Sequence, residues 1–143
     1  MDTINWLSMI LSTITPLVIG VAYFHKNLFG KVLTDTIGVS DKKPNTIVLI
    51  IVALILSFFL SFFLLNFNNS GINQEGDFDT FGHGVWHGVF VAITVVSPIV
   101  FITGLFSRQR LKPLLIIALY WIITLALMGG IIDAMNHWEN VLI

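Results

Sequence analysis

Four long apolar stretches, separated by polar segments, dominate the hydrophobic pattern of this chain. They cover residues 4–24, 45–66, 85–106 and 114–135. Each can cross the hydrocarbon core of a bilayer, which takes about 20 helical residues. The runs are continuous rather than alternating, and four strands could not close a membrane barrel, so helix is favoured over strand. The pattern predicts an all-α integral membrane bundle of four transmembrane helices, in a single domain over residues 1–143.

Composition favours a bilayer over water as the surroundings of this bundle. The chain is 56% hydrophobic and 10% charged over 143 residues, whereas about 25% of the residues of a soluble domain are charged. A soluble domain of this size could bury only about 60–70% of the surface that its unfolded chain exposes. We therefore expect the lipid bilayer as partner. The net charge of −1 does not indicate nucleic acid, and the absence of cysteine excludes disulfides and thiolate metal sites.

The positions of the basic residues predict the orientation of the bundle. They fall in the first and third connections, residues 25–44 and 107–113, whereas the second connection, residues 67–84, has none. Short loops that carry lysine and arginine stay in the cytoplasm. We therefore expect cytoplasmic loops at 25–44 and 107–113, an outer loop at 67–84, and both termini outside. The basic residues are Lys26, Lys31, Lys42, Lys43, Arg108, Arg110 and Lys112.

Two similar segments recur in the two halves of the chain. Residues 15–18 read Thr-Pro-Leu-Val and residues 97–100 read Ser-Pro-Ile-Val, an offset of 82 residues (97 minus 15). The spacing fits a two-hairpin parallel pseudo-repeat, but proline is frequent in membrane helices and the match can also arise without duplication. We expect each proline to kink its helix, and the neighbouring Thr15 and Ser97 hydroxyls to satisfy backbone groups there.

The first connection contains apolar residues at helical spacing, and two structures fit them. One is a short amphipathic helix at the membrane interface. The other is an irregular loop, because Gly30 and Gly38 weaken a helix. The apolar residues are Leu28, Phe29, Val32, Leu33 and Ile37.

Small residues recur every four positions at the start of the third span. Gly84, Gly88 and Ala92 share one helix face, and such a stripe lets two helix backbones approach closely in lipid. The stripe could serve the core of the four-helix bundle or the self-association of two copies. The pattern alone does not decide between these roles.

Polar residues gather at the predicted outer ends of the last two spans. His83 and His87 are four apart, as are Asp133 and His137, so each pair shares a helix face. The topology brings both pairs to the same outer level. Three imidazoles and a carboxylate could bind a divalent metal ion such as Zn²⁺, or they could form a polar network between the two helices. Acidic loop residues could supplement or replace a ligand: Glu75, Asp77 and Asp79.

Several short motifs resemble a known family over nearly the whole chain. They include Asn5-Trp6-Leu7, the segment Leu28-Phe29-Gly30-Lys31, the segment Gly84-Val85-Trp86-His87-Gly88 and the run from Tyr120 to Gly130. Together they resemble the bacterial membrane proteins catalogued as domain of unknown function 1761 (DUF1761). The resemblance implies a four-helix protein of the bacterial cytoplasmic (inner) membrane without an established activity, and it carries over no functional residue.

The sequence leaves three functions open. The first is a non-enzymatic structural or accessory subunit of a larger membrane complex, which fits the small size and the scarcity of polar groups within the spans. The second is a small oligomeric transporter or ion-handling protein, although no charge lies near the midplane, where transporter sites usually are. The third is a metal-dependent membrane enzyme with the four outer His and Asp residues as its site. We prefer them in this order and assign no catalytic residue.

Overall fold

The computed structural model describes residues 4–37, 45–68 and 80–136, and the regular structure in these ranges is helical. Within these described ranges, four helical segments are long and apolar enough to cross a membrane. These are α1 (Trp6–Tyr23), α3 (Thr46–Asn68), the segment Phe81–Phe106 and α6 (Leu111–Met135). The prediction of an all-α membrane bundle with four spans is therefore confirmed.

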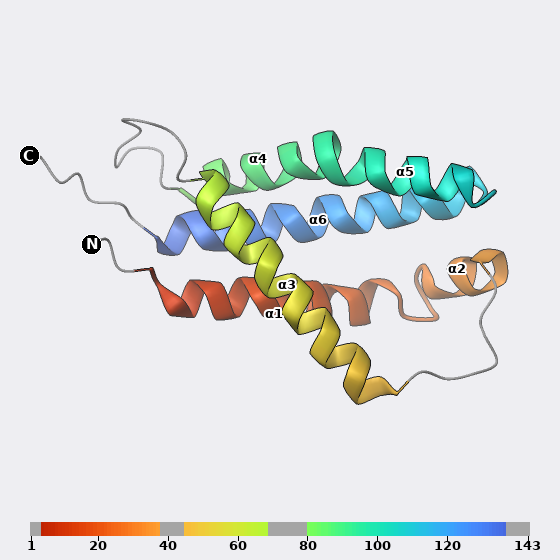
Figure 1. The fold of residues 1–143 in the computed structure, drawn as a ribbon, viewed down its shortest axis with the longest axis horizontal. Helices are drawn as coiled ribbons and strands as arrows, with labels where there is room; N and C mark the ends of the chain where they lie inside the picture. The colour runs from red at the N-terminus through yellow and green to blue at the C-terminus, as the bar shows by residue number, and fades with distance from the viewer. Residues whose placement is uncertain (1–3, 38–44, 69–79, 137–143) are drawn as a thin grey trace, which may run out of the picture.

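Helix α6 is the centre of the bundle. It contacts α1, α3, α4 (Phe81–Val91), α5 (Ser97–Phe106) and the short helix α2 (Gly30–Ile37). In Figure 1, α6 runs alongside α4 and α5, whereas α3 crosses the other helices obliquely. Half of the most apolar part of α6 (50%) is buried inside the protein, against 17% for α3. Helix α3 therefore presents most of its apolar surface to lipid.

Side-chain caps fix where two of the spans begin. The Asn5 side-chain oxygen accepts hydrogen bonds from the backbone N–H groups of Leu7 and Ser8. The Thr80 hydroxyl accepts one from the backbone N–H of His83. Such caps satisfy donors that the first helical turn leaves open. The third span consequently begins at Phe81, directly after its cap, rather than at the predicted residue 85.

The other helix ends also differ from the predicted ranges by a few residues. Helix α6 begins at Leu111 rather than at residue 114. Pro113 still lies in its first turn, where the missing N–H leaves no hydrogen bond unmade. Helix α3 ends at Asn68 rather than at residue 66. This extension turns Asn68 from a predicted loop residue into a helical one.

The third span is widened just before its proline. One π-helical turn, η1 (Ala92–Val96), precedes Ser97 and Pro98. Proline has no N–H with which to continue the regular hydrogen-bond ladder, and a wider turn adjusts the helix to that gap. The sequence predicts a kink at Pro98, and the structure shows a π-helical turn just before this residue. The predicted role of the Ser97 hydroxyl is wrong, because this buried group has no hydrogen-bond partner among the described residues.

Pro16 has different surroundings, inside the continuous helix α1. The Thr15 hydroxyl donates to the Leu11 carbonyl at 2.8 Å, and not to the Ser12 carbonyl, which is the one that Pro16 leaves without its N–H donor. The Tyr120 hydroxyl of α6 donates to the carbonyl of Pro16 itself, also at 2.8 Å. This hydrogen bond from the Tyr120 side chain to the backbone of α1 holds α1 against α6 inside the apolar bundle. The pseudo-repeat of the two halves stays a prediction.

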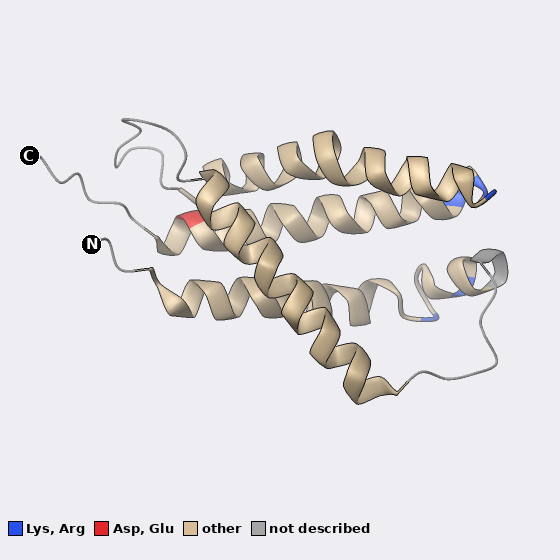
Figure 2. Cartoon of the chain, in the orientation of Figure 1, with Lys and Arg blue, Asp and Glu red and all other residues tan. Residues whose placement is uncertain are grey.

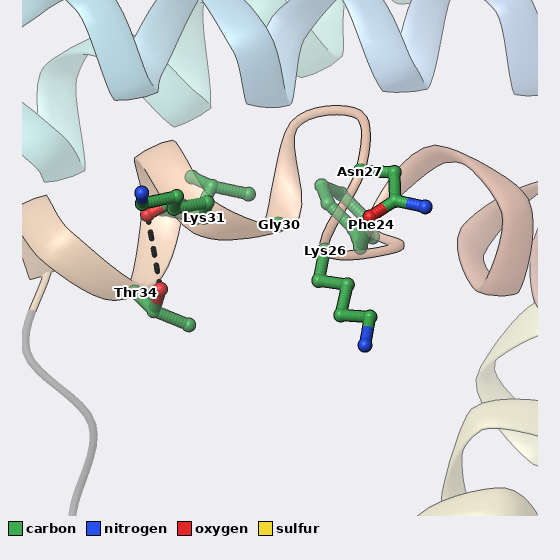
Figure 3. Close-up of a pocket in the computed structure, with 7 residues that line it drawn as sticks. Phe24, Lys26, Asn27, Gly30, Lys31 and Thr34 are labelled. Atoms are coloured by element: carbon green, nitrogen blue, oxygen red, sulfur yellow. Dashed lines mark hydrogen bonds between the residues drawn. The ribbon is translucent and has the colours of Figure 1, made fainter.

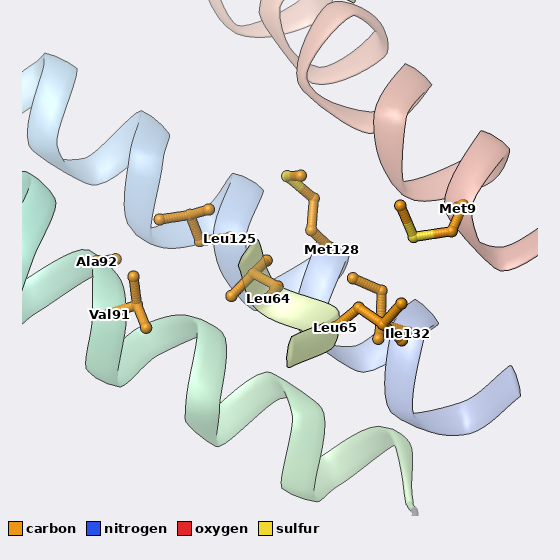
Figure 4. Packing of buried hydrophobic residues seen from close by; sticks show 8 residues of the cluster. All are labelled: Met9, Leu64, Leu65, Val91, Ala92, Leu125, Met128 and Ile132. Carbon is orange, nitrogen blue, oxygen red and sulfur yellow. The ribbon is translucent and has the colours of Figure 1, made fainter. Parts of the chain in front are cut away.

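An apolar cluster fills the space between α1, α3, α4 and α6. Leu64 of α3 and Leu125 and Met128 of α6 are completely buried there. Figure 4 shows side chains from four helical segments converging on this space. A smaller cluster around Tyr23 and Tyr120 lies toward α2. The larger cluster consists of Met9, Leu64, Leu65, Val91, Ala92, Leu125, Met128 and Ile132.

The stripe of small residues faces α6 of the same chain. A Cβ atom at Gly88 would lie 1.9 Å from the Leu125 carbonyl oxygen, and one at Gly84 would lie 2.1 Å from the Gly129 carbonyl oxygen. Ala92 is completely buried in the apolar cluster. Of the two predicted roles, the stripe therefore has the first, in the bundle core. These three residues pack against α6 within the chain, and self-association of two copies stays a prediction.

The first connection contains helix α2, so the amphipathic helix is confirmed over the irregular loop. Its residues Val32 and Leu33 pack against the smaller apolar cluster on α6. Lys31 and Thr34, on the other side of the helix, are exposed. The helix therefore covers the end of the bundle with its apolar side and turns its polar side outward.

The described basic residues gather at one end of the molecule. Figure 2 shows these lysines and arginines on the turn after α1, on α2 and at the α5–α6 connection. The acidic residue drawn in red lies near the opposite end of α6. The first and third connections thus lie at the same end, as predicted; Lys42 and Lys43 lie outside the described residues. Which side of the membrane this end occupies stays a prediction. We call it the basic end: Lys26, Lys31, Arg108, Arg110 and Lys112.

Candidate functional site

Two histidines of α4 and one aspartate of α6 meet at the end of the bundle opposite the basic end. His83 and His87 are one turn apart, with their ring centroids separated by 4.1 Å. Asp133 lies in the last turn of α6 and is 5% exposed. A Cβ at Gly84 would lie 2.8 Å from the Asp133 Cβ. The absence of a side chain at Gly84 therefore lets the two helices bring the rings and the carboxylate together.

A fourth residue, Asn68 at the end of α3, joins this group. The His83 Nδ1 is 3.0 Å from the Asp133 Oδ2, and the His87 Nδ1 is 3.0 Å from the Asn68 Oδ1. The Asn68 Nδ2 donates to the Asp133 Oδ1. We call Asn68, His83, His87 and Asp133 the His/Asp cluster. It connects the ends of three helices through side chains alone.

The hydrogen bonds determine which ring nitrogens carry hydrogen. The Asp133 carboxylate can only accept, so the His83 Nδ1 is the donor in that pair. Because the Asn68 Nδ2 faces Asp133, its Oδ1 faces His87 and accepts from the His87 Nδ1. The lone pair of a neutral His87 ring is therefore on Nε2. This is one of the two ring atoms through which histidine binds metal ions.

The cluster stabilises a buried carboxylate. A carboxylate removed from water costs several kcal/mol unless donors replace the water, by the usual order of magnitude. Both oxygens of Asp133 have such a donor, one from His83 and one from Asn68. The polar network between α4 and α6 is therefore present, and Asn68 extends it to α3. A network of this kind and a metal site do not exclude each other, since metal-binding side chains are commonly hydrogen-bonded as well.

The same side chains offer donors for a metal ion. One ligand atom from each of His83, His87 and Asp133 lies within 4.8 Å of the others. Ligands at about 2.0–2.1 Å from a tetrahedral zinc ion lie about 3.3 Å from one another. Side-chain movements of about 1 Å would therefore close the three donors around an ion. Two imidazoles and a carboxylate form a donor set that Zn²⁺ accepts in proteins, so the residues present fit this metal.

The structure brings together three of the four residues that the sequence predicted for this site. The fourth, His137, lies outside the described residues, as do Glu75, Asp77 and Asp79 of the outer loop. The sequence prediction missed Asn68. It ended the second span at residue 66 and assigned the residues from 67 onward to the outer loop. The signal that could have found Asn68 is its place just beyond an apolar run, at the same membrane level as the histidines.

A second polar contact holds α1 against the same end of α6. The Asn136 Oδ1 accepts from the Asn5 N–H at 3.0 Å, and its Nδ2 donates to the Ser8 hydroxyl at 2.7 Å. The Asn5 Nδ2 donates to the Met135 carbonyl at 2.8 Å. These bonds join the start of α1 to Met135 and Asn136 at the end of α6, two and three residues after Asp133. They also show that α1 begins at the end of the bundle where α6 finishes.

Comparison with known proteins gives a family but no activity. A family model described as "Protein of unknown function (DUF1761)" matches residues 7–132. The match covers Asn68, His83 and His87 and ends one residue before Asp133. No curated protein and no solved structure matches the chain.

Proposed function

The chain belongs to the DUF1761 family of proteins of unknown function, and we propose that it is a non-enzymatic accessory protein of the membrane that binds a divalent metal ion, such as Zn²⁺. The observation that carries this proposal is the mutual reach of His83, His87 and Asp133, whose ligand atoms lie within 4.8 Å of one another. The ion would fasten α4 to α6 at the end of the bundle. The fastened end would then be a rigid surface for a larger membrane complex.

Asn68 favours a structural over a catalytic role for this ion. Structural zinc sites are closed by four protein ligands, whereas catalytic sites keep one position open for water or substrate. The Asn68 carboxamide already contacts both His87 and Asp133. Asn68 belongs to α3, the third helix that contributes a residue to the cluster. An Asn68 oxygen next to the ion would close the site. This supports an accessory role ahead of the metal-dependent enzyme that the sequence also allowed.

The bundle core supports the same choice against a transporter. A transporter needs polar groups near the bilayer midplane. Between α1, α3, α4 and α6, the described part of the chain packs Leu64, Leu125 and Met128 with no exposed surface (Figure 4). Outside the His/Asp cluster, the polar side chains buried along α1, α3 and α6 within the spans are uncharged hydroxyls, such as those of Ser12, Ser61 and Thr124. The His/Asp cluster lies beyond this apolar layer, at the helix ends. Transport therefore ranks below the accessory role.

A direct metal measurement tests the proposal. Protein purified in mild detergent after growth with supplied zinc is expected to carry about one metal ion per chain by elemental analysis. The variant His83→Ala/His87→Ala removes both imidazoles and is expected to reduce the bound metal at least tenfold, because two of the three donors are lost. His25→Ala is the matched control, since His25 is exposed at the basic end.

The controls make the metal measurement decisive. His25→Ala should retain the full metal content of the parent protein, which excludes non-specific binding to histidine. Metal absent from the parent protein, or retained by the double variant, contradicts the proposal and leaves the His/Asp cluster as a hydrogen-bond network only. Circular dichroism of the variants distinguishes a lost site from a lost fold.

We further propose that the His/Asp cluster lies on the outer face of the bacterial cytoplasmic membrane, with the basic end in the cytoplasm. The gathering of the described lysines and arginines at one end supports this orientation (Figure 2). The chain has no cysteine, so a single introduced thiol can report its side. Gly82→Cys near the cluster and Lys112→Cys at the basic end are both at exposed positions.

Labelling of intact bacterial cells with a membrane-impermeant maleimide checks this orientation. Gly82→Cys is expected to react in intact cells, whereas Lys112→Cys is expected to react only after the membrane is opened. The reverse pattern would place the basic end outside and contradict the proposed orientation. The opened-membrane sample of each variant is the control for thiol reactivity.

A further inference from the structure

A cavity of about 620 Å³ lies at the basic end, between the turn that follows α1 and the first turns of α2. Its volume is within the range of small-molecule sites, about 300–1,000 Å³. Figure 3 shows Lys26 and Asn27 on the turn, Lys31 and Thr34 on α2, and Gly30 between the two groups. The described lining residues are Phe24, Lys26, Asn27, Gly30, Lys31, Leu33 and Thr34.

A tight reversal of the chain creates this cavity. The Gly30 N–H donates to the His25 carbonyl at 3.2 Å, and the Phe29 N–H donates to the Tyr23 carbonyl at 3.3 Å. A Cβ at Gly30 would lie 2.2 Å from the Phe24 carbonyl oxygen, so a glycine is needed where α2 folds back on the end of α1. The reversal holds the turn and α2 close together. Their polar side chains therefore surround one space.

The lining of the cavity is basic and polar on one side and apolar on the other. Lys26 and Lys31 supply two positive charges, and no acidic residue occurs among the described lining residues. Asn27 adds an amide that can donate hydrogen bonds, whereas the Thr34 hydroxyl already donates to the Lys31 carbonyl at 2.9 Å. Phe24 and Leu33 form the apolar wall, which continues into the smaller cluster on α6. Positive charge, a neutral amide donor and an apolar wall together match an anionic head group with an attached hydrocarbon.

We propose that this cavity binds the phosphate group of an anionic membrane lipid. Lys26 and Lys31 neutralise the phosphate, and the Asn27 side-chain amide donates a hydrogen bond to one of its oxygens. Lysine is a common phosphate-binding residue in proteins. Basic pockets at the ends of membrane helices bind anionic lipid head groups in the same way.

The position of the cavity favours a lipid over a soluble phosphate compound. Its first lining residue, Phe24, directly follows the last residue of α1, so the cavity lies at the level where a membrane helix leaves the hydrocarbon. The Leu28 side chain on the same turn is 58% exposed. An exposed leucine next to two lysines is stabilised when acyl chains cover the leucine and head groups surround the lysines.

Lipid binding by the full-length protein tests the proposal. Native mass spectrometry in mild detergent would measure binding of phosphatidylglycerol, with phosphatidylcholine as the lipid of the same phosphate but no net charge. We expect Lys26→Gln/Lys31→Gln to weaken phosphatidylglycerol binding about twentyfold, since each basic residue near anionic lipid contributes about fivefold. Asn27→Leu keeps both charges and removes the amide donor, so it should weaken binding about fivefold.

A matched pair at the other connection controls for charge alone. Arg110→Gln/Lys112→Gln removes two exposed charges from the same end without touching the cavity, and it should change binding less than twofold. Equal losses in the two double variants would show general electrostatic attraction and overturn the proposal. Millimolar inorganic phosphate is expected to leave the lipid bound; displacement of the lipid by phosphate would assign the cavity to a soluble phosphate compound instead. Unchanged helicity by circular dichroism confirms that each variant is folded.

Discussion

Replacing Gly88 by alanine is expected to lower the free energy of unfolding by about 3 kcal/mol or more. The added Cβ would lie 1.9 Å from the Leu125 carbonyl oxygen and 2.8 Å from the Ala126 backbone nitrogen. These are backbone atoms of α6, which cannot rotate aside as the end of a flexible side chain can. Helix α4 would have to move away from α6, and the apolar cluster between them would open. Unfolding by SDS in mixed micelles, followed by circular dichroism, measures the loss.

Gly82→Ala is the matched control on the same helix. A Cβ at Gly82 would have no other atom within 4 Å. This change is expected to leave stability unaltered or to raise it by up to about 1 kcal/mol, because alanine loses less conformational freedom than glycine in a helix. Equal stabilities of Gly88→Ala and Gly82→Ala would contradict the close α4–α6 contact.

The glycine contact also links packing to the proposed site. Gly84 and Gly88 alternate with His83 and His87 on α4, so any change in the distance between α4 and α6 moves both rings relative to Asp133. Gly88→Ala is therefore expected to reduce metal binding although Gly88 has no metal-binding atom. This couples the fold directly to the function that we propose.

Hydropathy and spacing were enough to predict most of this arrangement. The length of each apolar run determines a membrane span, because the bilayer has a fixed thickness. An even number of spans places the start of α1 and the end of α6 at one end of the bundle, and the Asn5–Asn136 hydrogen bond agrees with this. The spacing of His83 and His87 places them on one helix face. Their meeting with Asp133 could therefore be predicted before any coordinates.

The remaining features depend on contacts between helices, which a single sequence does not contain. The stripe of Gly84 and Gly88 indicated close packing but not whether α6 or a second copy would be the neighbour. Asn68 joined the cluster because α3 continues two residues beyond the predicted end (68 minus 66) and crosses the bundle obliquely. Helix length and crossing angle both follow from side-chain packing along α3. Neither is visible in a hydropathy pattern as uniform as that of α3.

Replacing Asp133 by alanine is expected to lower the free energy of unfolding by about 3 kcal/mol in the presence of a metal chelator. The chelator removes any contribution from a bound ion, so the measurement reports the hydrogen-bond network alone. Asp133 accepts from both His83 and Asn68, and alanine would leave these two donors without their acceptor. An SDS unfolding curve that coincides with that of the parent protein would contradict the stabilising role of the network.

Asp133→Asn separates this structural role from the proposed metal site. Its side-chain oxygen can accept from Asn68, and its amide can donate to His83 once that ring takes the other tautomer. The variant should therefore lose less than about 1 kcal/mol of stability in chelator. It lacks the negative charge of a carboxylate ligand, however, and is expected to bind zinc at least tenfold more weakly than the parent protein. Retention of zinc by Asp133→Asn would show that Asp133 only positions His83, and zinc loss with retained stability would identify the carboxylate as a ligand.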